Sequence, residues 1–254
     1  MLFEKYQTVR TQLISQAIEL AAIYHGNYTH ICQLTDRQTA AIKFAKVGKS
    51  ALHRGYYCPN PIKERLVGNN SRGRLVKTDG PASNFYYNFN CQETLIGAHK
   101  KGATINTDEF LIYTSNVCWG IEYSCKAGNT WLNHISSTVF EEGKVTLAVD
   151  FLFDATRLRS IRGWCFDYTT DGQLTAALSS DCAVYNGLLD DHDLIRYYDF
   201  LHNCNGDITQ YRCIQPPVWT RENQDYRNLS RPIKQESWHD PRGMLPSYWA
   251  SLKK

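Results

Sequence analysis

The alternation of apolar and polar residues changes character along the chain, and each stretch predicts a different kind of element. In residues 2–24 the apolar side chains recur every three or four positions, at Leu2, Tyr6, Val9, Leu13, Ala17, Leu20, Ala21 and Tyr24. This spacing places them on one face of an α-helix. Gly26 then provides a stop signal. We therefore expect a long amphipathic N-terminal helix whose apolar face packs on a sheet or on another helix.

Residues 84–180 contain short runs rich in aromatic and β-branched residues, separated by turn signals, which is the pattern of antiparallel strands. The runs are NFYYNFN, ETLIGAHK, DEFLIYTS, CWGIEYSC, TWLNHIS, KVTLAVDFLFD, RSIRGWCFDY and QLTAALSS. Two of the connections, Glu142-Gly143 and Asp171-Gly172, are typical of tight hairpins. The stretch predicts an antiparallel β-meander of roughly six to eight strands.

The remaining stretches are less regular. Residues 27–83 read as a loop-rich basic insertion or subdomain, with one strand expected near 42–47 and little regular structure elsewhere. In residues 190–203, aspartates precede apolar residues that share a helical face, so a second helix is expected there. Prolines make residues 214–243 an irregular C-terminal wrap. The whole predicts a single α+β domain over 1–254, with the long N-terminal helix packed on the sheet.

Composition narrows the class of protein. No stretch approaches the roughly 18 apolar residues of a membrane helix, and the charged N-terminus does not resemble a secretion signal, so we expect a cytoplasmic protein. The nine cysteines are odd in number and scattered, which favours reduced thiols over disulfides. Because no two of them are spaced as C-x-x-C, a zinc site of that type is disfavoured. We expect neither a metal nor another cofactor.

The net charge of +3 conceals an uneven distribution. Residues 1–105 carry a formal charge of +8, residues 106–210 carry −9 and residues 211–254 carry +4. Such a division has two interpretations: either the basic and acidic surfaces meet inside the fold, or one of them is exposed to a partner.

The most basic stretch surrounds a Gly-Lys-Ser tripeptide at residues 48–50. A phosphate-binding loop of the G-x-x-x-x-G-K-[ST] type needs a glycine at position 43, where this chain has Lys43. Between residues 37 and 77, however, cations, glycines and tyrosines are combined as anion contact and base stacking require. The candidate binding residues are Lys49, Arg54, Tyr56, Tyr57, Arg72 and Arg74. The alternatives are a solvated cationic face, or one that pairs with the acidic middle of the chain.

Two further pairs of residues invite a chemical interpretation. If Glu142-Gly143 forms a two-residue turn with regular pairing, His134 faces Phe151 while Asp150 lies across from Ile135. The two side chains are then expected on opposite faces, with His134 in the core and no joint role. Asp199 and His202, three positions apart on the expected second helix, are near enough to share a metal ion, but helix capping and a solvated face explain them better.

For function, these observations favour a cytoplasmic binding protein that engages an acidic protein partner through residues 37–77, as an inhibitor or immunity-type protein would. The alternative is an enzyme acting on a phosphate-bearing substrate or a nucleic acid. Its anion ligands would be Lys49, Arg54, Arg72 and Arg74, and its proton carriers would come from His25, His53 and His99. A pocket in which perturbed histidines cluster would support the enzyme. A structural subunit of a larger assembly is the third class, and the oligomeric state is left open.

Overall fold

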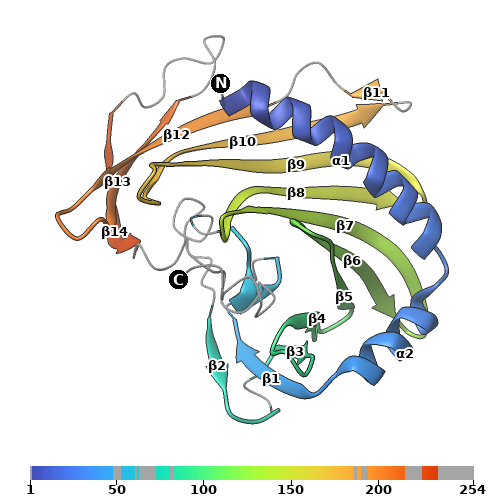
Figure 1. The fold of residues 1–254 in the computed structure, drawn as a ribbon. Coiled ribbons are helices and arrows are strands. Elements are labelled where there is room, and N and C mark those ends of the chain that lie inside the picture. Colours follow the sequence, from blue (N-terminus) through green and yellow to red (C-terminus); the bar gives the residue numbers. More distant parts are fainter. Residues whose placement is uncertain are drawn as a thin grey trace.

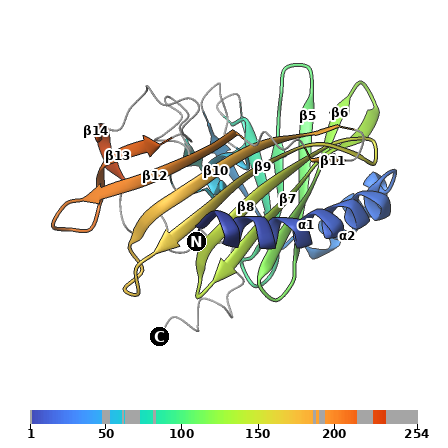
Figure 2. The same cartoon turned by 90° about the horizontal axis from the view of Figure 1, so that it is seen from above.

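The computed structural model describes residues 2–47, 53–60, 62, 73–80, 83–185, 188–189, 194–214 and 225–233. Within them, a single antiparallel sheet of 14 strands curves strongly, and two α-helices lie against its outer face (Figures 1 and 2). The helices are α1 (Leu2–Tyr24) and α2 (Tyr28–Gln38), and a short 3-10 helix, η1, covers Gly55–Tyr57. None of the helices in these ranges is long and apolar enough to cross a membrane.

The strands follow one another along the chain as β1 (Ala41–Lys46), β2 (Arg74–Val76), β3 (Phe85–Phe89), β4 (Leu95–Lys100), β5 (Asn106–Tyr113), β6 (Val117–Lys126), β7 (Asn129–Glu141), β8 (Lys144–Asp154), β9 (Arg157–Tyr168), β10 (Leu174–Tyr185), β11 (Leu188–Leu189), β12 (Leu194–His202), β13 (Ile208–Ile214) and β14 (Arg227–Ile233). From β3 to β10 every strand pairs with the next one in sequence, which is a meander. At one end β1 lies between β3 and the edge strand β2, and at the other end β12, β13 and β14 extend the sheet beyond β10.

The sheet has an apolar core on each face. On the convex face, the predicted stripe of α1 is buried through Tyr6, Leu13, Ala17 and Ala21, which pack with residues of β6–β10. The helix ends as expected, because Gly26 adopts the left-handed conformation with φ of +80°. The concave face carries a second core, to which the segment around η1 contributes Tyr57 and Ile62 (Figure 1). The curved sheet thus encloses residues 53–60.

The long N-terminal helix on an antiparallel sheet is confirmed, and so are the eight strands expected between residues 84 and 180, which are β3–β10. The strand expected near 42–47 is also confirmed, as β1. The prediction of six to eight strands was wrong, because the sheet continues with further strands beyond both ends of the predicted meander.

The helix predicted for residues 190–203 is not found in the part of that stretch that the structure describes. Residues 194–202 form strand β12, in which Tyr198 and Phe200 are buried two positions apart, the period of a strand rather than of a helix. Pairing with both β10 and β13 outweighs the local helical pattern. The helix that does exist, α2, lies in a stretch for which little regular structure was expected. Residues 227–233 of the predicted irregular wrap form β14, and most of that wrap lies outside the described residues.

Candidate functional site

A cavity of about 280 Å³ opens on the concave face of the sheet. Its lining comes from strands β3–β9 and from the segment just before η1. The side chains that line it are His53, Arg54, Phe85, Ala98, Lys100, Thr107, Glu109, Glu122, Asn133, His134, Asp150, Leu152 and Arg162. Eight of these thirteen residues have ionisable side chains, so charge dominates the chemistry of the cavity.

The ionisable groups are aligned because their strands are in register. Glu109 on β5 lies directly opposite Glu122 on β6, which in turn lies opposite His134 on β7. Asp150 on β8 is opposite Arg162 on β9. Since residues that oppose each other in a sheet share a face, all five side chains belong to the concave face. The result is a row of charged and polar groups across five neighbouring strands.

A β-bulge at Asn133 aims His134 into the cavity. Tyr123 pairs with Leu132 and Glu122 pairs with His134, so that Asn133 is an extra residue in β7. Without it, regular alternation would place His134 on the same face as Leu132, which is buried in the convex core. The bulged residue also has a role of its own: Asn133 Nδ2 donates a hydrogen bond of 3.2 Å to Glu122 Oε1.

A second bulge, in β8, overturns the expectation that His134 and Asp150 face opposite sides. The Glu142-Gly143 turn forms and Phe140 pairs with Val145, as predicted. The next pair, however, joins Val139 to Leu147 and leaves an extra residue in β8, so the register slips by one position. Because a slip of one reverses the faces, Asp150 joins His134 on the concave face. His134 Nε2 lies 3.1 Å from Asp150 Oδ1.

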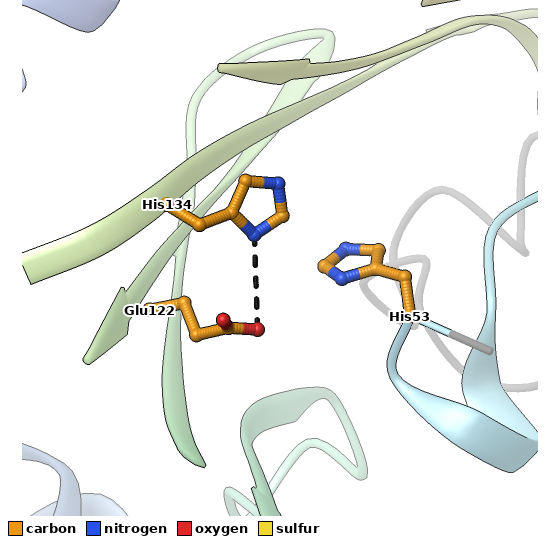
Figure 3. A group of neighbouring side chains, drawn as sticks. All are labelled: His53, Glu122 and His134. Atoms are coloured by element: carbon orange, nitrogen blue, oxygen red, sulfur yellow. Dashed lines mark ion pairs between the residues drawn. The ribbon is translucent and has the colours of Figure 1, made fainter. Parts of the chain in front are cut away.

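His53 reaches the same space from the other side of the cavity. Its ring lies edge-on to that of His134, with 5.1 Å between the ring centroids. Figure 3 shows His53, Glu122 and His134 pointing toward one another from three separate segments. His134 Nδ1 is 3.7 Å from Glu122 Oε2, and His53 Nε2 is 3.4 Å from Glu109 Oε1. Each of the two rings therefore has one nitrogen beside a carboxylate that lies outside this group of three.

Arg54 fixes the segment that carries His53. Its Nε donates to Glu109 Oε1 at 2.9 Å and its Nη2 donates to Ser136 Oγ at 2.6 Å, while Ser136 Oγ donates to Glu109 Oε1. The Arg54 side chain is 0% exposed and that of Glu109 is 3% exposed. Gly120 makes room for them, because a Cβ there would lie 1.9 Å from Glu109 Oε1. The buried ion pair joins the basic N-terminal third of the chain to its acidic middle third.

The environment moves the pKa values of these groups in different directions. Burial lowers the pKa of His53. Burial would also lower the pKa of His134, but the hydrogen bonds and charges of Asp150 and Glu122 outweigh it and raise the pKa to about 10. Burial would raise the pKa of Glu109, but the charge of Arg54 outweighs burial and holds that pKa below its usual value. The site thus combines a histidine that favours its neutral form with one that favours its charged form and would release a proton on binding a metal ion.

His53, Glu122 and His134 could hold a metal ion. Their donor atoms all lie within 4.8 Å of one another. Two imidazoles and one carboxylate are a donor set used by catalytic zinc and by non-haem iron. Each of the three also contacts a second polar group that can orient it: Glu109 for His53, Asn133 for Glu122 and Asp150 for His134.

Of the candidate binding residues from the sequence, the structure describes Arg54, Tyr56, Tyr57 and Arg74, and these four do not form one exposed surface. Arg54 is buried against Glu109, and Tyr57 is 3% exposed, in contact with the rings of Tyr87 and Phe89. Tyr57 therefore does not offer an exposed surface for base stacking. Tyr56 is half-buried and Arg74 is exposed on β2. Lys49 and Arg72 lie outside the described residues.

Of the three proposed proton carriers, only His53 lines the cavity. His25 is exposed just after α1, and His99 lies on the convex side with its Nδ1 2.8 Å from Asp108. Asp199 and His202, considered as a metal pair but better explained by capping and solvation, lie on strand β12 and not on a helix, and residues three apart on a strand point to opposite faces. Glu122 was not considered from the sequence. His134 and Asp150 were considered together but placed on opposite faces, because their register depends on the two bulges.

Comparison with known proteins assigns no family, because no protein-family model and no curated protein matches this chain. The function must therefore be argued from the chemistry of the cavity.

Proposed function

We propose that the protein is a metal-dependent enzyme, and that His53, Glu122 and His134 hold a divalent transition-metal ion in the concave-face cavity. The observation that carries the proposal is the convergence of two imidazoles and a carboxylate from three segments, each oriented by a second polar group. Outer groups of this kind are typical of metal-binding histidines, in which they fix the ring and the nitrogen that faces the ion.

The distances support the proposal without a large rearrangement. Ligands at about 2.1 Å from a tetrahedral ion are about 3.4 Å from one another. Glu122 Oε2 and His134 Nδ1 are already 3.7 Å apart. Binding an ion therefore requires the three donors, now within 4.8 Å of one another, to approach by at most about 1.4 Å.

Three protein ligands leave coordination positions for water or for a substrate, which is the arrangement of catalytic rather than structural sites. The ion would act as a Lewis acid on a bound polar group. The surrounding cavity, at about 280 Å³, is near the lower end of the range of roughly 300–1,000 Å³ that small-molecule sites occupy. A small polar substrate suits this volume. The enzyme class that the sequence left as the alternative is thus favoured over a partner-binding role for this site.

The test is to titrate the metal-depleted protein with Zn²⁺ and to measure the binding by isothermal titration calorimetry. We expect one site, and we expect His134→Gln and Glu122→Gln each to weaken binding by at least 10-fold. Asp150→Asn, which removes an orienting group, should weaken binding by about 10- to 100-fold.

His99→Gln is the matched control, because His99 is also a buried histidine held by a carboxylate but faces α2 on the other side of the sheet. Wild-type affinity in His134→Gln, or an equal loss in His99→Gln, would show that the cluster is an ordinary buried ion network.

The acidic protein partner expected for residues 37–77 stays a separate proposal. One observation supports it: Arg37, Lys43, Lys46, Arg74 and Lys77 are all exposed, and Lys46 lies directly opposite Arg74 at the edge of the sheet. Retention on a heparin column that falls with salt, and falls further in the Lys46→Glu/Arg74→Glu variant, is the expected result. Equal retention of variant and wild type would refute it.

A further inference from the structure

We infer that the substrate carries a phosphate group, which Lys100 binds inside the cavity next to the metal ion. This inference rests on the proposed function, since the metal ion supplies part of the charge that attracts the group.

Lys100 is positioned for this role by the register of β4. It lies opposite Thr107 of β5, and both side chains line the cavity beside the row of ionisable groups. The neighbouring residue, Lys101, follows β4 and binds Asp79 with its Nζ 2.6 Å from Oδ1. Two adjacent lysines thus have different surroundings, one in the cavity and one at an exposed ion pair.

Lys100 differs from the other cations of the cavity in lacking a carboxylate partner. Arg54 is paired with Glu109, and Arg162 is paired with Asp181 across β9 and β10. Among the residues that the structure describes, no carboxylate lies within ion-pair distance of the Lys100 ammonium group. Lys100 is half-buried, and a cation that is partly shielded from water gains more from an anion than a fully solvated one does, because water screens it less.

The balance of charge points in the same direction. Apart from the two histidines, the cavity is lined by three cations, Arg54, Lys100 and Arg162, and by three carboxylates, Glu109, Glu122 and Asp150. The charges of these six lining residues cancel; Asp181, which pairs with Arg162, is not part of the lining and is not counted. A bound divalent ion would therefore leave the cavity with an excess of positive charge. A phosphate dianion compensates such an excess better than a singly charged carboxylate does.

The experiment measures binding of inorganic phosphate to protein loaded with one equivalent of Zn²⁺ and freed of excess metal. We expect saturable binding that weakens by about 10-fold or more in Lys100→Met, as loss of a charge-assisted hydrogen bond implies. Lys101→Met serves as the control and should bind phosphate like the wild type. Zinc affinity, measured separately, should be the same in all three proteins.

The outcomes separate the two proposals. If zinc binds and phosphate does not, or if Lys100→Met binds phosphate like the wild type, the phosphate assignment is wrong and the metal centre stands. If acetate binds as tightly as phosphate, the assignment to a phosphate group is equally wrong. If zinc does not bind to the wild type, both proposals fail together.

Discussion

Replacing Arg54 by methionine should destabilise the protein more than the loss of one surface charge would. Glu109 Oε1 accepts hydrogen bonds from Arg54 and from Ser136, and its side chain is 3% exposed. In Arg54→Met that carboxylate keeps the Ser136 hydroxyl and the His53 ring, whose Nε2 lies 3.4 Å away, but it loses its permanently charged partner. Water has little access to it, so its charge is left uncompensated.

The expected size follows from the burial of both partners. Breaking a buried ion pair by removing one member costs about 3–5 kcal/mol. For a chain of this length each kcal/mol lowers the melting temperature by roughly 2–4 °C, so a decrease on the order of 10 °C is expected. Removing both charges together should cost less than the sum of the single changes, because no orphaned charge remains.

The assay is urea unfolding at neutral pH, monitored by circular dichroism. It compares the wild type, Arg54→Met, Glu109→Leu and the double variant. We expect a coupling energy of about 2 kcal/mol or more between the two positions. Additive effects of the two substitutions, or a cost below about 1 kcal/mol for Arg54→Met, would mean that the pair is solvated and that it does not anchor the His53 segment.

Two further expectations concern the convex face. Gly163→Ala should destabilise the protein by about 1–3 kcal/mol, because the new Cβ would lie 2.3 Å from the hydroxyl of the buried Tyr6 and force α1 away from β9. The same unfolding assay measures this effect, and unchanged stability would contradict the packing of α1 on β9. Burial would raise the pKa of Asp108, yet the hydrogen bonds from His99 and Tyr28 hold it below its ordinary value of 3.8. This carboxylate therefore stabilises the fold above about pH 4 and loses that effect as the pH falls through its lower folded-state pKa. The stability difference between wild type and Asp108→Asn should accordingly shrink on acidification, and a difference independent of pH would refute the assignment.

The local sequence pattern predicted an element correctly where the spacing of its apolar residues fits only one kind of secondary structure. The stripe of α1 and the strands β3–β10 each have a clear period, and the Glu142-Gly143 turn has a clear signature. Residues 194–202 were misread because their apolar positions fit a helix nearly as well as a strand. Only the pairing with β10 and β13, which is distant in sequence, decides between the two.

The candidate site was harder to predict because it depends on register. Asn133 and the extra residue of β8 carry no sequence mark of a bulge, and each shifts every later side chain of its strand to the other face. His134 and Asp150 were for this reason assigned to opposite faces. His53 was considered as a proton carrier, but its partners lie on strands far along the chain.

The order of the strands bears on how the centre is assembled during folding. Between β3 and β10 each strand pairs with its successor, so these contacts close short loops. The segment that carries His53 is different, since the Arg54–Ser136 hydrogen bond joins residues 82 positions apart. Closing a longer loop costs more conformational entropy, and contacts of this kind slow folding. We therefore expect the hairpins to form first and His53 to join Glu122 and His134 last. A folding chain should then acquire affinity for metal only in its final kinetic phase.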